Sequence, residues 1–220
     1  PDKGAVLSQI SAFWFRETRD IFPNHLLGLA SDHPELDLST EIARRAMVVR
    51  KAQRIDVECV ARGFIAGSAW AEYRKSGTVQ GQSIPHGLRE GDKFPDVLFT
   101  PTTKADVGHD ENLDFSDVVN MVGAELAERL KVTTIEIYSH CRDLAHEKGI
   151  IIADTKLEFG LVDGELVLID ELLTPDSSRL WDQSRYAPGN SQPNFDKQFV
   201  RDWLNSYGWD HEPPAPELPE

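Results

Sequence analysis

Residues 154–160 carry two carboxylates and one ammonium at every second position, a spacing that could bind a cation or an anionic substrate. If this segment is a β-strand, its side chains alternate between two faces, so Asp154, Lys156 and Glu158 share one face. The residues between them suit an ordinary core face. Two carboxylates and an ammonium then lie within about 14 Å of strand. A solvated row of salt bridges would have the same pattern, and this segment alone does not exclude it.

The residues that follow predict a hairpin that brings two further acidic residues back beside the same strand. Asp163-Gly164 predicts a turn, and the apolar residues 166–169 lead back to Asp170 and Glu171. Carboxylate oxygens are the ligands that hard divalent cations prefer. The hairpin therefore predicts a divalent cation site.

The register of this hairpin decides whether Glu158 and Asp170 can share a cation. A strict two-residue turn would oppose Glu158 to Ile169 and turn Asp170 to the other face. A three-residue loop over 162–164, with its glycine left-handed, opposes Glu158 to Leu168 and keeps Asp170 on the same face. We therefore predict the bulged, three-residue turn.

Composition limits the class of protein. The chain has 220 residues, 40% of them hydrophobic, and a net charge of -14. A folded protein is expected, and the acidity argues against a nucleic-acid partner, because phosphate binding needs a basic surface. No apolar run is long enough to span a membrane. The two cysteines match no metal or disulfide spacing, and a cytoplasmic protein is expected. The oligomeric state stays open, a homo-oligomer included.

Hydrophobic periodicity predicts an α+β fold without internal repeats. The first helix begins almost at Pro1, which is how an internal segment of a protein begins. Ser116 is expected to cap a later helix, and Thr133 with Glu136 to form a capping box that opens the next one. The other expected elements are strands at 46–50 and 55–62, a helix opened by Ser68, the hairpin, and a last helix from about Asn194.

Four further clusters suit anions, and each also has a purely structural explanation. The glycines and serine of 62–68 could bind an anion at a helix N-terminus or form a tight turn with a cap. The other three clusters supply hydroxyls, cations and acids: residues 100–104 with 109–111, residues 176–179, and Lys197 with Arg201.

Taken together, these clusters resemble the signatures of one enzyme family. Six blocks match the SAICAR synthetases in order and spacing: residues 55–68, 99–104, 109–112, 152–160, 173–179 and 195–203. The resemblance covers essentially the whole chain. It departs from the family at the start, because the family's N-terminal segment, with a glycine-bearing hairpin over the ATP phosphates, is absent from this chain.

The resemblance implies a fold and a reaction. The fold is α+β and SAICAR synthase-like, two-lobed and related to ATP-grasp, with mixed or antiparallel sheets flanked by helices. Residues 1–60 would be the remainder of the N-terminal lobe, 61–212 the central and C-terminal ligase lobe, and 213–220 an acidic, proline-rich tail. The reaction joins the carboxylate of CAIR to L-aspartate with ATP and Mg²⁺, through an acyl phosphate, in purine biosynthesis.

The resemblance also implies roles for individual residues. Lys156, Asp154 and Arg179 would be catalytic, with Lys156 neutralising phosphate charge. The metal would be held by Glu158 and Asp170, and ATP would also meet Lys156 and the backbone of Glu58 and Val60. The implied substrate-binding residues are Arg62, Ser68, Lys104, His109, Asp110, Asp154, Arg179, Lys197, Gln198 and Arg201.

Two other functions stay open at this point. One is a non-catalytic homologue that binds nucleotides or metabolites, and the missing N-terminal segment favours it. The other is a kinase on a related fold, such as an inositol phosphate kinase. Residues 100–111 argue against the kinase, because a phosphate-only acceptor would not need them.

Overall fold

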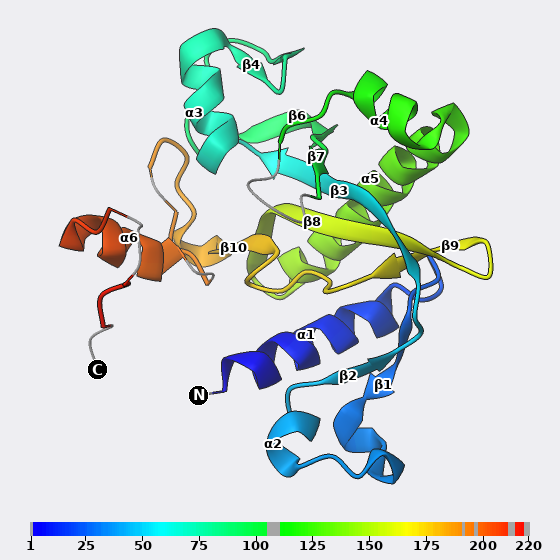
Figure 1. Ribbon diagram of the computed structural model, residues 1–220. Helices are drawn as coiled ribbons and strands as arrows, with labels where there is room; N and C mark the ends of the chain where they lie inside the picture. Colours follow the sequence, from blue (N-terminus) through cyan, green and yellow to red (C-terminus); the bar gives the residue numbers. More distant parts are fainter. Residues whose placement is uncertain (1, 105–110, 191, 196–197, 211–213, 218–220) are drawn as a thin grey trace.

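The structure is a computed structural model, and it describes all residues except 1, 105–110, 191, 196–197, 211–213 and 218–220 (Figure 1). The helices are α1 (Lys3–Glu17), α2 (Thr40–Ala43), α3 (Gly67–Ser76), α4 (Phe115–Val122), α5 (Ala124–Glu147) and α6 (Gln198–Tyr207). The strands are β1 (Leu26–Leu29), β2 (Met47–Val49), β3 (Gln53–Phe64), β4 (Thr78–Val79), β5 (Gln82–Ser83), β6 (Lys93–Phe99), β7 (Thr102–Thr103), β8 (Ile150–Val162), β9 (Glu165–Ile169) and β10 (Ser178–Asp182). The predicted α+β class is confirmed.

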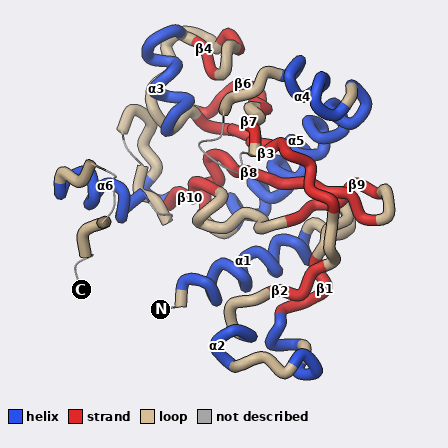
Figure 2. Tube along the Cα trace, in the orientation of Figure 1, coloured by secondary structure: helices blue, strands red, loops and turns tan. Residues whose placement is uncertain are grey.

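The main sheet is built on two long neighbouring strands, β3 and β8 (Figure 2). Its order is β10-β8-β3-β6, with β9 also paired to β8 and β7 to β3, and these pairs are antiparallel. Opposed residues of an antiparallel pair point to the same face. The opposed pairs Glu58–Glu158, Val60–Lys156 and Arg62–Asp154 therefore form one continuous face, which we call the charged face.

The opposite face of the sheet packs on α5. Cys59, Leu157 and Phe159 are fully buried there, in one cluster with Ile137 and Tyr138 of the helix. These strand residues alternate with those of the charged face, as the sequence predicted for 154–160. Burial of this side fixes the strand register, because a one-residue slip would move every charged residue into the core.

Three of the expected helix caps are wrong, and one of them is Ser68, because α3 begins at Gly67 with Ala66 as its N-cap and no side chain caps it. Helix α5 runs unbroken through Thr133, which is buried in its interior, and Thr134 Oγ1 donates to the Leu130 carbonyl at 2.6 Å. Thr133 is thus an interior residue of α5 and its neighbour Thr134 bonds back to the same helix, so the Thr133–Glu136 pattern does not mark a helix start. Helix α4 is capped by Asp114, which forms a capping box with Asp117, and not by Ser116.

A β-bulge changes the alternation of β8 just before the charged face. Arg179 of β10 opposes Asp154, but the next residue, Leu180, opposes Ile152, which leaves Ala153 as the extra residue. Ile152 is fully buried in the cluster with α5, whereas Asp154 lies on the charged face. Bulges of this kind redirect side chains next to functional sites.

The predicted three-residue hairpin turn is wrong. Val162 opposes Glu165, so the turn has two residues, and Glu158 opposes Ile169. Both turn residues, Asp163 and Gly164, have positive φ, 53° and 83°. Aspartate tolerates this conformation, and two such residues give a turn whose twist matches the strands, so no bulge is needed.

Asp170 follows β9 directly but does not continue the strand. Its own φ is +64°, so the chain leaves the extended conformation directly after β9. Side chains alternate between the two faces of a sheet only while the backbone is extended, so the side chain of Asp170 need not follow that alternation. The charge of Asp170 contributes to raising the pKa of Glu158.

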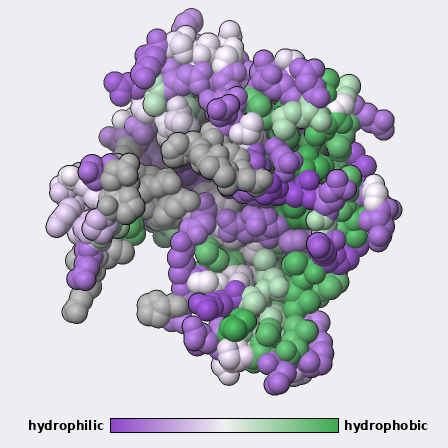
Figure 3. All heavy atoms as spheres, in the orientation of Figure 1, coloured by the Kyte–Doolittle hydropathy of each residue, from purple (hydrophilic) through white to green (hydrophobic). Residues whose placement is uncertain are grey.

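The smaller part of the molecule comprises α1, β1, β2 and α2, which lie below the main sheet in Figure 1. β3 runs without a break across residue 60, and the predicted division at that residue stays a prediction. Figure 3 shows hydrophilic residues across the middle of the same view and exposed hydrophobic ones below. Within the described residues, no helix is both long and apolar enough to cross a membrane.

Candidate functional site

Two arginines share one carboxylate at the β10 end of the charged face. Asp154 Oδ2 accepts from Arg62 Nη1 at 2.8 Å and also from Arg179 Nη1, and Arg62 Nε donates to Thr100 Oγ1 at 2.9 Å. Asp154 is 4% exposed. Burial lowers the pKa of Arg62, and the charge of Asp154 opposes that shift. One carboxylate between two guanidinium groups leaves a net positive charge, which suits an anionic ligand.

The N-terminus of α3 lies beside these arginines. Gly67 has a φ of +56°, and a Cβ at this position would clash with the Arg179 guanidinium. No side chain caps the helix, and Ser68 is exposed in its first turn. Free backbone N–H groups at this end add partial positive charge to that of the arginines. A cavity of about 120 Å³ opens beside Gly67 and Arg179, lined also by Asn194.

Two glutamates and two lysines form the other end of the charged face. Lys104 Nζ lies 3.1 Å from Glu58 Oε1 and 2.7 Å from Glu158 Oε1, and Lys156 Nζ lies 2.6 Å from Glu58 Oε1. Glu58 and Glu158 are 4% and 5% exposed. Burial raises the pKa of Glu158; the hydrogen bond from Lys104 opposes this, and the charge of Asp170 adds to it.

Residues 100–104 reach the charged face through alternate side chains. Besides Thr100 and Lys104, Thr102 Oγ1 donates to Glu58 Oε2 at 3.3 Å. The cause is the pairing of β7 with β3, where Thr102 opposes Glu58. Of these three residues only Lys104 was predicted as a site residue, although the stretch was noted for its hydroxyls, and the alternation of Thr100, Thr102 and Lys104 was the signal for the other two.

The charged face has the chemistry of a cation site. Within the described ranges, no group of three His, Cys, Asp or Glu residues could hold a metal ion. Mg²⁺ in nucleotide sites is commonly held by one or two carboxylates together with phosphates and water, so a site can form with fewer than three protein ligands. The Lys104 ammonium lies between two buried glutamates here, which shows that this position attracts positive charge.

Some of the predicted site residues cannot be placed. His109, Asp110 and Lys197 lie outside the described residues. Gln198 and Arg201 belong to α6, but their side chains are not described. The segment before α6 is tied to β10, because Phe195 N donates to the Leu180 carbonyl at 2.8 Å.

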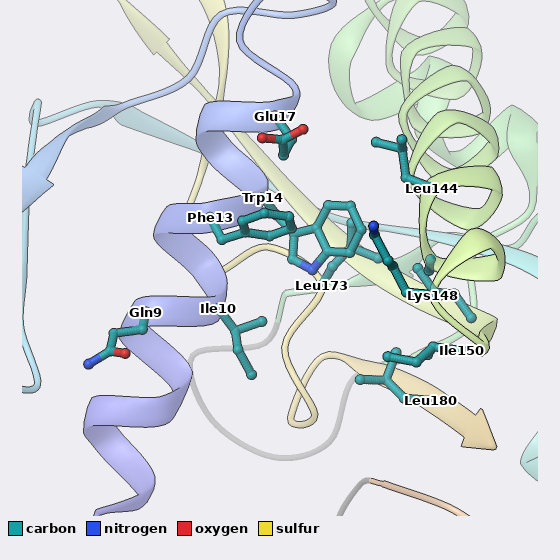
Figure 4. Close-up of a pocket in the computed structure, with 12 residues that line it drawn as sticks. Gln9, Ile10, Phe13, Trp14, Glu17, Leu144, Lys148, Ile150, Leu173 and Leu180 are labelled. Atoms are coloured by element: carbon teal, nitrogen blue, oxygen red, sulfur yellow. The ribbon is translucent and has the colours of Figure 1, made fainter.

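A separate apolar cavity of about 430 Å³ lies between α1 and α5 (Figure 4). Trp14, Leu144, Ile150 and Leu173 line it, together with Lys148. It contains no residue of the charged face. The groups suited to anion chemistry are therefore on the sheet, not in this cavity.

The fold and site together define an α+β protein whose antiparallel sheet carries, on one face, paired charged groups suited to small anionic ligands. The sequence model of the SAICAR synthetase family matches residues 1–216. This chain belongs to the SAICAR synthetase family.

Individual relatives agree with this assignment. Two relatives are phosphoribosylaminoimidazole-succinocarboxamide synthases, and each is 50% identical to this chain and covers all of it. The alignment with the Elusimicrobium minutum enzyme spans 227 residues and 77% of that enzyme. The alignment with the Geotalea uraniireducens enzyme spans 224 residues and 76% of that enzyme. The SAICAR synthase of Saccharomyces cerevisiae, solved in complex with SAICAR, superposes with a TM-score of 0.87 at 40% identity, covering all of this chain and 75% of that one. A SAICAR synthetase in complex with ADP shares the fold, with a TM-score of 0.72 at 23% identity over 99% of this chain and 84% of that one.

Proposed function

We propose that this chain carries the ligase reaction of its family. ATP would drive formation of an amide between the carboxylate of CAIR and the amine of L-aspartate, giving SAICAR, ADP and phosphate. The observation that carries this proposal is the division of the charged face into two ends. The arginine end at Asp154 and the glutamate end at Glu158 are four residues apart on β8, about 13 Å. Two anionic ligands fit such a face with their reacting ends between the clusters.

The arginine end would hold CAIR. Arg62, Arg179, the α3 N-terminus and Ser68 offer positive charge and donors to its phosphate or carboxylate. Asp154 would keep both guanidinium groups in place. Lys197, Gln198, Arg201, His109 and Asp110 stay predicted contributors to substrate binding.

The glutamate end would hold the nucleotide and its metal. Glu158 and Asp170 would hold Mg²⁺, which when bound neutralises phosphate charge as it develops. Lys156 would add a further positive charge to the phosphates. We assign the Glu58 side chain to holding Lys104 and Lys156, while contact of the 58–60 backbone with adenine stays a prediction.

The residues would act mainly by positioning. A carboxylate oxygen of CAIR attacks the γ-phosphorus of ATP, forming the acyl phosphate as ADP leaves. The aspartate nitrogen then attacks the acyl carbon, and phosphate leaves as the nitrogen loses a proton. Fixed cations at both ends of the face would hold these anions together against their repulsion, which supplies orientation and charge stabilisation.

The direct test is an ADP-release assay on the full-length protein. Sustained release over many turnovers should require both CAIR and L-aspartate, because without aspartate the reaction stops at the acyl phosphate. Glu158→Gln should lower kcat by about 100-fold or more, because a charge-stabilising group is removed. Glu165→Gln, an exposed change in the same hairpin, is the control and should leave kcat unchanged.

Two outcomes would contradict the proposal. Sustained ADP release over many turnovers with CAIR but without aspartate would indicate a kinase. Full activity of folded Glu158→Gln would remove Glu158 from the metal site.

A further inference from the structure

The hydroxyl group of Tyr138, on α5, reaches the backbone of β8 at its bulge. Its oxygen lies 2.7 Å from the Ile152 carbonyl oxygen, to which it donates, and 3.4 Å from the carbonyl oxygen of Ala153. Tyr138 has no exposed surface. The two carbonyls belong to the extra residue of the bulge and to the residue before it.

Strand β3 leaves room for this hydroxyl at Gly63. A Cβ at that position would clash with the Tyr138 hydroxyl and would also lie 2.9 Å from Cζ of the same ring. The φ of Gly63 is not positive, so this position uses the missing side chain and not backbone freedom. Gly63 directly follows Arg62, which opposes Asp154. The phenol therefore meets the sheet beside the arginine end of the charged face.

The bulge decides which face Asp154 takes. Ile152 packs in the core with α5, and in regular alternation the residue two positions later would point to the same side. The extra residue Ala153 interrupts the alternation, so Asp154 lies on the charged face opposite Arg62. There its carboxylate accepts from both Arg62 and Arg179.

The hydroxyl group, and not the ring, is what Tyr138 contributes to the bulge. A bulge disrupts the regular hydrogen bonds of a strand pair, and Tyr138 supplies a donor from outside the sheet. A phenylalanine would fill almost the same volume of the core without donating. The hydrogen bond to Ile152 therefore separates a role in the bulge from a role in packing.

We propose that Tyr138 is a positioning residue: its hydroxyl holds the Ala153 bulge, and through the bulge it orients Asp154 and the two arginines for an anionic substrate. This inference rests on the proposed binding of CAIR at the arginine end. Tyr138 itself belongs to the core cluster behind the sheet, so it acts through the backbone of β8.

The test is steady-state kinetics of the full-length protein, with CAIR and ATP varied in turn. Tyr138→Phe should raise the KM for CAIR about fivefold, the effect of one hydrogen bond, and leave the KM for ATP unchanged. Cys141→Ala is the matched control, because Cys141 is also a fully buried residue of α5 in the same core cluster and loses one heavy atom. It should lower the Tm and leave both KM values unchanged, since the hydrogen bond to the bulge stays.

Gly63→Ala tests the same contact from β3. The added Cβ should displace the phenol from the Ile152 carbonyl and raise the KM for CAIR about fivefold or more. In the Tyr138→Phe background that hydrogen bond is already gone, so Gly63→Ala should raise the KM by a smaller factor there. Equal factors in the two backgrounds would mean that Gly63 and the hydroxyl act separately, which would overturn the proposal.

Arg62→Gln separates failure of this inference from failure of the proposed function. If folded Arg62→Gln keeps a normal KM for CAIR, the arginine end does not bind CAIR and the inference falls with it. If Arg62→Gln raises this KM but folded Tyr138→Phe matches the wild type, the site stands and the role of Tyr138 is overturned. Equal increases in Cys141→Ala and Tyr138→Phe would also overturn it, because lost core packing would then explain the effect.

Discussion

The two buried carboxylates at the glutamate end are paired with a lysine side chain of the protein. Glu58 and Glu158 are almost fully buried, and buried carboxylates are costly unless they are paired. Lys104 bridges both. Burial alone would lower the pKa of Lys104, but its hydrogen bonds to Glu158 and Glu58 raise it above the ordinary value, so the ammonium stays charged. A divalent cation at Glu158 would compete with this ammonium.

Lys104→Gln should therefore bind Mn²⁺ more tightly in the absence of nucleotide. We expect about a tenfold gain, the lower end of what a hydrogen bond between charged groups contributes. Titration calorimetry measures it, with Lys148→Gln, at the apolar cavity, as control. Unchanged affinity in Lys104→Gln would mean that the lysine and the cation do not compete.

At the scale of elements, the close approach of α3 to β10 builds the arginine end. Gly67 opens the helix in a left-handed conformation, with Arg179 packed where a Cβ would stand. The Ala153 bulge places Asp154 on the charged face to meet the same arginine. Helix or strand propensity predicts neither contact, because the first needs a positive φ at Gly67 and the second a bulge at Ala153.

Gly67→Ala should displace the Arg179 guanidinium and raise the KM for CAIR by at least about tenfold, the effect of losing a charged hydrogen bond. Gly81→Ala is the matched control, because Gly81 also has positive φ, +71°, but no atom lies within 4 Å of a Cβ there. Both substitutions should cost about 1–2 kcal/mol of stability through backbone strain. The KM should change in Gly67→Ala alone, and equal KM values would argue against the contact with Arg179.

At the scale of the whole molecule, the core behind the charged face excludes water and so raises the pKa of its buried thiols. Burial raises the pKa of both the Cys59 and Cys141 thiols to about 12. The folded thiols therefore keep their protons up to a higher pH than the unfolded ones, whose ordinary value is 9.0. Their contribution to stability is complete below pH 9 and is lost as the pH rises toward 12.

Urea unfolding at pH 9 and at pH 10.5 should show this loss, with each thiol contributing up to about 1.4 kcal/mol per pH unit. Cys59→Ala should have a shallower decline than the wild type, because one of the two thiols is gone. Parallel declines in the two proteins would show that Cys59 does not ionise on unfolding.

The sequence predicted the composition of the charged face well. Alternation placed Asp154, Lys156 and Glu158 together, and the structure adds Glu58 and Arg62 opposite them. The hairpin turn was predicted wrongly, and the helix boundary at Thr133 as well. Both errors arose where a local pattern fits two backbone conformations that differ by about 1 kcal/mol, so that tertiary packing selects between them.

By itself, the sequence determined which side chains share each face of the long strands, because the two-residue period follows from backbone geometry alone. It also determined the family, because six blocks keep their order and spacing. Only the tertiary structure decided that Lys104 bridges Glu58 and Glu158 and that Gly67 meets Arg179. These contacts join residues far apart in the chain, and strand register and a few unusual φ angles set them, neither of which leaves a periodic signal.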